Sequence, residues 1–280
     1  MAALPGYRRE DEMPKARVNG ISLNYNVEGQ GEPLVLMMGG GGPGWMWFFQ
    51  TRVFKKHCRV VTFDARDAAL GKTDNPSEPY TMKTMADDTI GLMDHLGIDR
   101  AHILGFSMGG MIAQELAINY PERVRKLILA STVSSAGQIA PELLGLFGLR
   151  EGFSEGDWAS VDVRRGLGSA TALAFNSRLN RMLVGLLFPI CERLGWFERL
   201  KGQRGAVAGC DTLDRLHTIT APTLVIVGTE ERCVQIHASE VMASRIPNAR
   251  LVRVDGGTHA QVFEMRSRFN EEVLSFLRGG

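Results

Sequence analysis

The chain carries almost no net charge and has no long apolar run. Its 280 residues include 32 Lys and Arg against 31 Asp and Glu, a formal net charge of +1. Nucleic-acid and membrane-surface binders concentrate basic residues, so this balance argues against both classes. No apolar run reaches the ~18 residues needed to cross a bilayer. Residues 1–15 are polar and mixed in charge, without the apolar core of a signal peptide.

Cysteine is scarce as well. The four cysteines, Cys58, Cys191, Cys210 and Cys233, are scattered without the spacing of metal ligands. We therefore expect reduced, mostly buried thiols rather than disulfides or a zinc site, as in a cytoplasmic protein. The rest of the composition, 44% hydrophobic and 22% charged, is typical of a soluble globular chain that buries a sizeable core.

The order of the apolar runs predicts an α/β fold. Strand-like runs alternate with helix-like ones, which implies a mostly parallel, twisted sheet flanked by helices, with function at the carboxyl ends of its strands. A β-hairpin with a tight turn at Asn19-Gly20 comes first. The expected strands are 33–38, 58–64, the run that closes at 104, 124–130, 221–228 and 250–254, and the expected helices are 81–97, the run that opens at 111, 234–245 and 260–277.

The alternation stops between residues 134 and 213. This stretch contains several amphipathic helical patterns and no strand-like run between them. We expect an inserted helical lid over the site, because it lies between strands whose loops would carry the chemistry. The alternative is that these helices simply pad the sheet. The predicted domains are a core of residues 1–133 and 214–280 and a lid of residues 134–213.

One short motif provides a candidate nucleophile. Gly105, Ser107 and Gly109 match G-x-S-x-G, with an apolar strand pattern before them and a helix pattern after them. A serine at the tip of so sharp a turn has a strained backbone, so the residues two positions away must lack side chains that would collide. The strand–turn–helix context is the one that this nucleophile elbow requires.

A serine nucleophile needs a general base and an acid that orients the base. Of the six histidines, His259 stands apart, because it lies in a glycine-rich loop that leaves the last strand. The acid is expected after the preceding strand, where Glu231 is the first choice and Glu230 the fallback. Asp255 is a weaker choice, since it is only four residues from His259 in the same loop. The strand that ends at Ala130 is followed by no carboxylate.

Acyl chemistry also needs two N–H donors for the developing oxyanion. The N–H of Met108 is one, and the second is expected from the glycine run after residue 38, at Gly40 with Gly41 close behind. The run lacks the Lys-Ser/Thr pair of a phosphate-binding loop, while a merely flexible loop stays open as an alternative. Residues expected to line a substrate pocket, unless they are plain core, are Gly41, Trp45, Trp47, Phe106, Phe147 and Trp158.

Taken together, these motifs resemble the α/β-hydrolase superfamily over nearly the whole chain, most of all the lid-bearing bacterial esterases, enol-lactonases and proline iminopeptidases. The segments that carry the resemblance are 39–44, 64–66, 79–81, 105–110, 120–124, 221–228 and 257–259. Three departures stand out. Met38 replaces the usual histidine that orients the oxyanion loop, the loop from Asp64 to Thr73 has two extra residues and lacks a glycine, and the acid is Glu where Asp is commoner.

The resemblance implies an α/β-hydrolase fold and hydrolysis of a carboxylic ester or lactone through an acyl-enzyme. Ser107 would be the nucleophile, His259 the base and Glu231 the acid. A carbon–carbon bond hydrolase and a proline iminopeptidase-type aminopeptidase remain alternatives on the same triad, as does a ligand-binding protein that has lost catalysis. No metal or organic cofactor is implied. The expected partner is a small-molecule ester or lactone, with no nucleic acid and no membrane, and a homodimer is left open.

Overall fold

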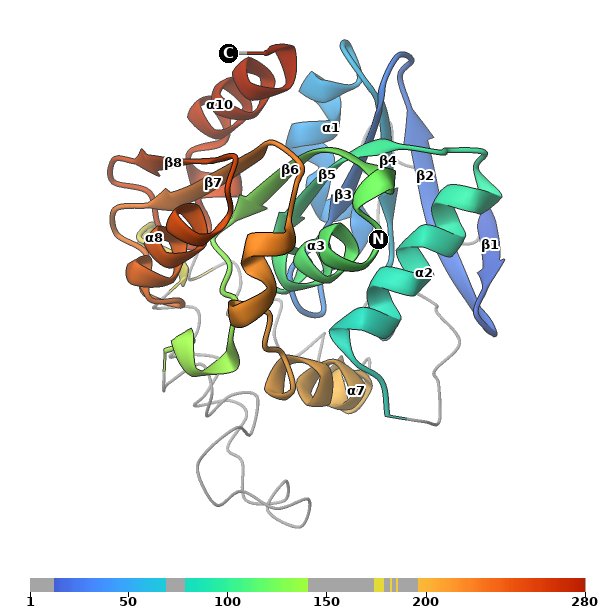
Figure 1. The fold of residues 1–280 in the computed structure, drawn as a ribbon, viewed down its shortest axis with the longest axis horizontal. Helices are drawn as coiled ribbons and strands as arrows, with labels where there is room; N and C mark the ends of the chain where they lie inside the picture. Colours follow the sequence, from blue (N-terminus) through green and yellow to red (C-terminus); the bar gives the residue numbers. More distant parts are fainter. Residues whose placement is uncertain are drawn as a thin grey trace.

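The structure is a computed structural model, and it describes residues 13–68, 79–140, 174–178, 182, 185 and 196–279. Within these residues, eight strands form one sheet in the order β1-β2-β4-β3-β5-β6-β7-β8 (Figure 1). The strands are β1 Lys15–Val18, β2 Ile21–Glu28, β3 Pro33–Met37, β4 Arg59–Phe63, β5 Ala101–Phe106, β6 Val124–Ala130, β7 Thr223–Gly228 and β8 Ala249–Val254. Pairing is parallel from β4 to β8 and antiparallel at β1–β2 and β2–β4. The predicted α/β class and mostly parallel sheet are confirmed.

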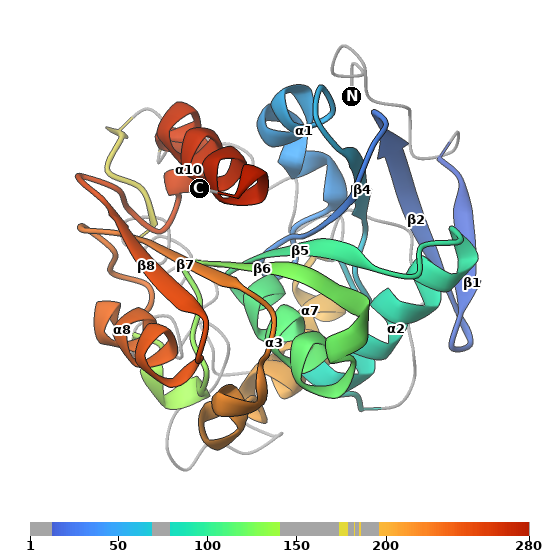
Figure 2. The ribbon, with the colours of Figure 1, turned by 45° about the horizontal axis from the view of Figure 1, so that its top comes forward.

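Helices cover both faces of the sheet (Figure 2). Helices α2 (Met82–His95), α3 (Met108–Asn119) and α8 (Ile236–Arg245) lie on one face, and α1 (Phe48–Phe54) and α10 (Arg266–Arg278) lie on the other. The remaining elements are α7 (Trp196–Ala208), α9 (Gln261–Glu264) and the 3-10 turns Gly44–Trp47, Pro121–Arg123, Ala136–Gln138 and Leu213–Thr218. Figure 1 places α7 below α3, in the lower part of that view.

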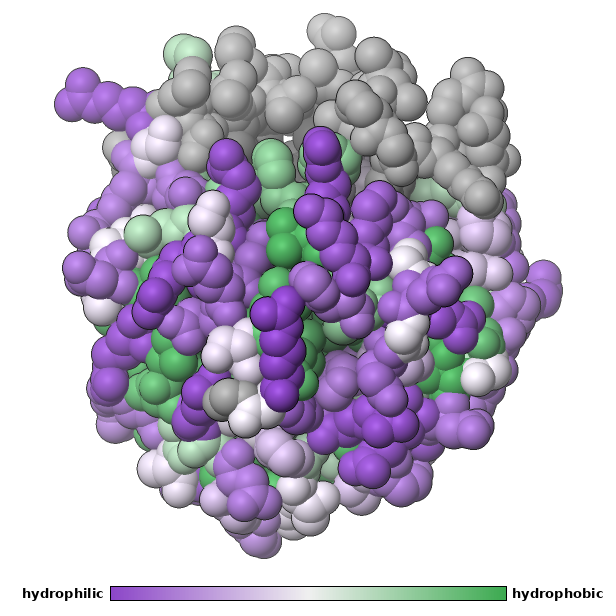
Figure 3. All heavy atoms as spheres, turned by 90° about the horizontal axis from the view of Figure 1, so that it is seen from above, coloured by the Kyte–Doolittle hydropathy of each residue, from purple (hydrophilic) through white to green (hydrophobic). Residues whose placement is uncertain are grey.

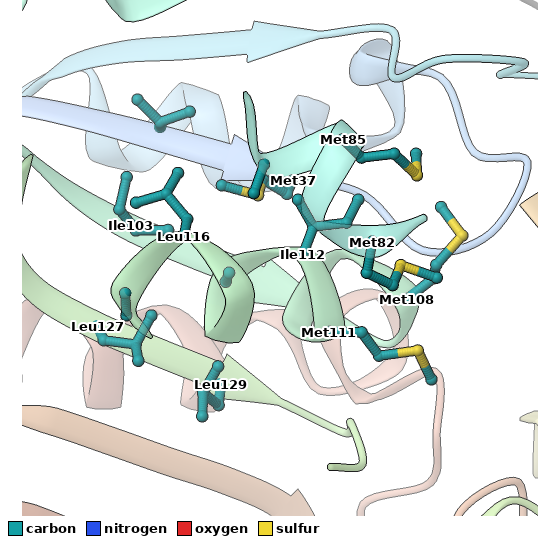
Figure 4. Close-up of a cluster of buried hydrophobic side chains, with 14 of the residues drawn as sticks. Met37, Met82, Met85, Ile103, Met108, Met111, Ile112, Leu116, Leu127 and Leu129 are labelled. Carbon is teal, nitrogen blue, oxygen red and sulfur yellow. The ribbon is translucent and has the colours of Figure 1, made fainter. Parts of the chain in front are cut away.

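The central strands consist of continuous apolar runs because both of their faces are buried. Along β3, Val35 and Met37 join the core under α2 and α3, whereas Leu34 and Leu36 join the core under α1 and α10. This two-residue alternation is the geometry of a pleated strand between two helical layers. Figure 4 shows the first core, with Ile112 and Leu116 of α3 among residues of the strands and the methionines gathered near the start of α3.

Local signals explain where several elements begin and end. Asn19 and Gly20 both have positive φ, as the tight turn of the predicted hairpin requires. Helix α2 begins after a capping box in which the side chains of Thr81 and Thr84 each accept the other residue's backbone N–H. The continuous helix predicted for 260–277 is wrong in one respect: it is broken at Met265 into α9 and α10.

The predicted lid lies largely outside the described residues. Its described portion includes α7, which is helical as expected of that stretch. Phe147 and Trp158, named as pocket residues from the sequence, also lie outside the described residues. Among the helices that the structure describes, none is long and apolar enough to cross a membrane. The face shown in Figure 3 is mostly hydrophilic, with hydrophobic residues in small separate spots.

Candidate active site

The strand β5, the turn at Ser107 and helix α3 form the predicted nucleophile elbow. Ser107 has φ 53° and ψ −122°, a strained conformation for a residue with a side chain. A Cβ on Gly105 would lie 2.2 Å from the carbonyl oxygen of Gly109, and a Cβ on Gly109 would lie 2.2 Å from the carbonyl oxygen of Met37. Both glycines are therefore required by close backbone approach, which is the physical reason for the motif.

The turn brings Ser107 to His259. The Nε2 atom of His259 lies 3.1 Å from the hydroxyl oxygen of Ser107, although the two residues are 152 positions apart. On the other side of the ring, Nδ1 lies 3.0 Å from each carboxylate oxygen of Glu231. The structure therefore brings together all three side chains that the sequence suggested, from the loops that follow β5, β7 and β8.

Glu231 is held as an anion in a buried place. Its side chain is 0% exposed. Burial by itself raises the pKa of this carboxyl. The charge and hydrogen bond of His259, together with hydrogen bonds from the Cys233 N–H and the Ser131 hydroxyl, lower the pKa by more than burial raises it, so it lies below its ordinary value. A carboxylate can only accept, so Nδ1 of His259 carries the proton. Nε2 is then free to accept the proton of the Ser107 hydroxyl.

Two further residues support Glu231 that the sequence did not point to. Ser131 follows β6, is fully buried and has φ 44°, and its hydroxyl donates to Glu231. Gln261, the first residue of α9, donates from Nε2 to the Ser131 hydroxyl oxygen over 2.9 Å. The sequence carried one signal for this arrangement, namely that the position after β6, which can hold the acid in this fold, has a serine and no carboxylate.

The glycine loop between β3 and the turn Gly44–Trp47 lies directly against Ser107. A Cβ on Gly39 would come within 3.2 Å of the Cβ of Ser107. The N–H of Gly42 donates to the carbonyl of Gly39 over 2.9 Å, which closes a turn with Gly40 and Gly41 at its tip. At the far end of the loop, the N–H of Gly44 donates to the buried carboxylate of Asp64 over 2.9 Å.

The two expected oxyanion donors come from the elements on either side of Ser107, namely α3 and the glycine loop. Met108 is the first residue of α3, so its N–H is one of the four that have no partner within the helix. Gly40 lies at the tip of the glycine-loop turn, one residue from Gly39. The N–H of Gly41, by contrast, donates to Oε1 of Gln203 over 2.7 Å and is already committed. Gly40 therefore remains our assignment for the second donor.

The expected pocket residues occupy different places. Phe106 is buried with its ring centroid 5.1 Å from that of His259, so it packs against the base. Trp47 is fully buried and meets Phe106 edge-on at 6.4 Å. Trp45 is partly exposed on the turn that follows the glycine loop.

One set of described residues could hold a metal ion. A carboxylate oxygen of Glu231, the sulfur of Cys233 and a ring nitrogen of His259 lie within 4.8 Å of one another. Ligation would require the Cys233 thiolate and the lone pair of His259 Nδ1. Burial raises the pKa of the Cys233 thiol above its ordinary value, and Nδ1 carries the proton shared with Glu231. This arrangement suits proton relay better than metal binding.

Comparison with known proteins agrees with this geometry. A family model described as "alpha/beta hydrolase fold" matches residues 32–265. A protein of Azorhizobium caulinodans named "Putative carbamate hydrolase RutD" is 28% identical over 94% of this chain and 98% of its own, and one of the same name from Caulobacter sp. (strain K31) is 31% identical over 89% and 91%.

Among solved structures, the enol-lactonase from Burkholderia xenovorans LB400 is 26% identical, with a TM-score of 0.79 over 95% of this chain and all of that one. Est816, described as an N-acyl homoserine lactone degrading enzyme, is 28% identical, with a TM-score of 0.75 over 94% and 100%.

Proposed function

The chain belongs to the α/β-hydrolase family, and on that basis we propose that it is a serine hydrolase that cleaves a carboxylic ester or lactone through an acyl-enzyme. The observation that carries the proposal is the continuous relay from Glu231 through His259 to Ser107, with contacts of 3.0 and 3.1 Å. A hydroxyl hydrogen-bonded to an oriented neutral imidazole is the arrangement that activates serine near neutral pH.

Each side chain has one task in the proposed reaction. The Ser107 oxygen attacks the substrate carbonyl carbon while its proton passes to Nε2 of His259, and the charge of Glu231 stabilises the imidazolium that forms. The N–H groups of Met108 and Gly40 stabilise the oxyanion. Collapse of the tetrahedral intermediate breaks the bond to the leaving alcohol, which takes the proton from Nε2. Water then attacks the acyl carbon while its proton passes to Nε2 of His259. The bond to the Ser107 oxygen breaks, that oxygen takes the proton back from Nε2, and the acid leaves.

Ester or lactone substrates are favoured by the solved structures that the chain resembles. Two of these, at 26% and 28% identity over their full length, are described as an enol-lactonase and an N-acyl homoserine lactone degrading enzyme. The curated relatives named for carbamate hydrolysis support a second candidate function, because a carbamate carbonyl can be attacked by the same serine. These two candidates differ only in whether the carbonyl carries an alkyl group or a nitrogen.

The test is a substrate panel run on one purified sample. It contains p-nitrophenyl esters, lactones, carbamates and aminoacyl anilides, and we expect the highest kcat/KM for an ester or lactone. Ser107→Ala should abolish turnover, whereas Ser239→Ala, which removes a buried hydroxyl of α8, should not. Full activity in Ser107→Ala would refute the assignment. A burst of p-nitrophenol equal to the enzyme concentration would separate an acyl-enzyme from a protein that only binds ligands.

We also propose that the protein acts on a small molecule in the cytoplasm. Supporting this, the described cysteines Cys58, Cys210 and Cys233 are free and buried, which suits a reducing compartment.

A further inference from the structure

The glycine loop beside Ser107 needs an external restraint. Residues 39–42 are all glycine, and Gly41 has φ 69°, so the loop has no side chains of its own to fix its shape. The first donor, Met108, is fixed by the regular geometry of α3. The second donor, the N–H of Gly40, belongs to the Gly39–Gly40 peptide, whose carbonyl accepts from the Gly42 N–H over 2.9 Å. On the other side of Gly40, the Gly40–Gly41 peptide has to be held by a partner from outside the four glycines.

Position 38 does not supply that restraint. In the families that this chain resembles, a histidine there orients the loop, but here the residue is Met38. Its side chain is buried beneath the loop, because a Cβ on Gly42 would lie 2.4 Å from its Cγ. A thioether fills space but is a weak hydrogen-bond acceptor and no donor, so it cannot fix a peptide group in direction.

Gln203 on α7 supplies it instead. The residue is 2% exposed, and both ends of its carboxamide are used. Oε1 accepts from the Gly41 N–H over 2.7 Å, and Nε2 donates to the carbonyl of Arg66 over 2.7 Å. The two partners fix which end is which, since one offers only a proton and the other only a lone pair. One side chain therefore ties the glycine loop to the loop that follows β4.

The described start of the second loop, up to residue 68, is held by side-chain contacts of its own. The guanidinium of Arg66 makes two hydrogen bonds to the buried carboxylate of Asp88 on α2, over 2.8 and 2.9 Å. Next to it, the Tyr80 hydroxyl donates to Asp67 over 2.6 Å. Helix α7 sits directly on this pair at Gly202, where a Cβ would lie 2.4 Å from the Tyr80 ring and 2.5 Å from an Asp67 oxygen. The depth at which α7 docks is therefore set by backbone contact at Gly202.

We propose that Gln203 is a positioning residue: it holds the Gly40–Gly41 peptide and thereby fixes Gly40 from the side opposite to its N–H, so that this N–H keeps its direction for oxyanion stabilisation and α7 takes over the role of the missing histidine at position 38. The proposal rests on the proposed serine hydrolase function. It implies that the Gly41 N–H is permanently engaged, and that the seating of α7 governs the second donor.

The first test removes the two hydrogen bonds while keeping the volume, with Gln203→Met. Loss of one oxyanion donor typically lowers kcat by about 10²–10³-fold, so a misaligned donor should lower kcat by about 10- to 100-fold. KM for a p-nitrophenyl ester should stay within about threefold, because the ground-state carbonyl depends less on this donor. Inhibition by an arylboronic acid, whose tetrahedral adduct presents an oxygen to the same N–H groups, should weaken in parallel with kcat.

The second test changes the seating of α7 without touching Gln203. Gly202→Ala places a methyl group against Tyr80 and Asp67, while Gly205→Ala, on the same helix, meets no atom of the described residues within 4 Å. Both changes favour the helix equally. Only Gly202→Ala should lower kcat. If Gln203→Met fails to fold, this pair decides the question.

The measurements distinguish a positioning role of Gln203 from a loss of stability, and both from a failure of the proposed serine hydrolase function. Rates are expressed per active site, counted by the p-nitrophenol burst, and Gln50→Met serves as a second fully buried glutamine that should lower stability but leave kcat unchanged. Amide exchange at Gly41 should accelerate in Gln203→Met, whatever the protein hydrolyses. A kcat per site within twofold of wild type in both Gln203→Met and Gly202→Ala would overturn the proposal. Absence of any turnover by the wild-type protein would instead overturn the proposed function.

Discussion

Replacing Glu231 by Gln tests the relay at its most buried point. The substitution keeps the shape of the side chain but exchanges one acceptor oxygen for an NH₂ donor. Both carboxylate oxygens lie 3.0 Å from Nδ1 of His259, so the amide either repels the Nδ1 proton or drives it to Nε2. In the second case the imidazole presents a proton to Ser107 where it must present a lone pair.

The magnitude follows from the charge that is lost. In the transition state the imidazolium and the carboxylate attract each other by about 4 kcal/mol at ~4 Å and an effective dielectric constant of ~20. In this protein the two groups are closer, at 3.0 Å, and are joined by hydrogen bonds, so their attraction is larger than this figure. Since each ~1.36 kcal/mol is a factor of ten in rate, Glu231→Gln should lower kcat by about 10³- to 10⁴-fold.

The assay is kcat for a p-nitrophenyl ester, with the active sites counted by the burst. Glu230→Gln is the matched control, because Glu230 is the neighbouring residue and accepts instead from the Asn176 side chain. Its kcat should stay within about twofold, as is usual for a substitution away from the reacting groups. A kcat for Glu231→Gln within tenfold of wild type, or a larger loss in Glu230→Gln, would refute the assignment of the acid.

Two further predictions concern the support of the relay and a histidine at the amino end of the central strand β5. Ser131→Ala removes a donor from Glu231, so the pKa of that carboxyl should rise and kcat should fall by about tenfold, the rate equivalent of one hydrogen bond to a charged group. Ser134→Ala, which removes an equally buried hydroxyl bonded to Gln138, should leave kcat unchanged. Burial, together with the positive charges of Lys126, Arg125 and Arg100 against the single carboxylate of Glu32, lowers the pKa of His102 to about 4. The unfolded chain protonates this residue first, so stability present above pH 6.5 should be lost as the pH falls towards 4, and the decline in Tm should be shallower in His102→Gln; identical Tm profiles would contradict this.

Much of the fold was predictable because the sheet is buried on both faces. Strands such as β3 and β7 consist almost entirely of apolar residues. In a chain where strand-like and helix-like runs alternate, that pattern predicts a parallel strand buried on both faces. The relay residues were predictable for a different reason. Ser107 and His259 each have glycines close by in the sequence, which indicate a tight backbone approach around Ser107 and a loop before His259. Glu231 comes soon after Gly228, which marks the end of a strand.

The break at Met265 could not be predicted from periodicity. Phe263 of α9 packs against Phe106 at 6.3 Å, while Phe269 and Val273 of α10 are buried in the core. On one straight helix, positions 263 and 269 point about 120° apart, since each residue turns by ~100°. A change of direction between α9 and α10 lets both aromatic rings pack into or against the same core, Phe269 fully buried and Phe263 partly buried. Tertiary packing therefore overrides the local helical pattern.

The supporting residues Gln203 and Ser131 also escaped the sequence. Gln203 lies in the middle of a helix without a motif, and its partner Gly41 is 162 positions away. Ser131 is an ordinary small residue whose importance depends on φ 44° and on the neighbouring strand. Hydrogen bonds of this kind are properties of the assembled molecule, because nothing in the local spacing specifies the partner.

The order in which the relay residues are synthesised has a consequence for the growing chain. The base follows the nucleophile by 152 residues, and the acid precedes the base by 28. If the proposed function holds, an elbow serine on a nascent polypeptide has no general base until residue 259 has been made. On that proposal, the complete relay forms only when the loop after β8 has emerged and docked.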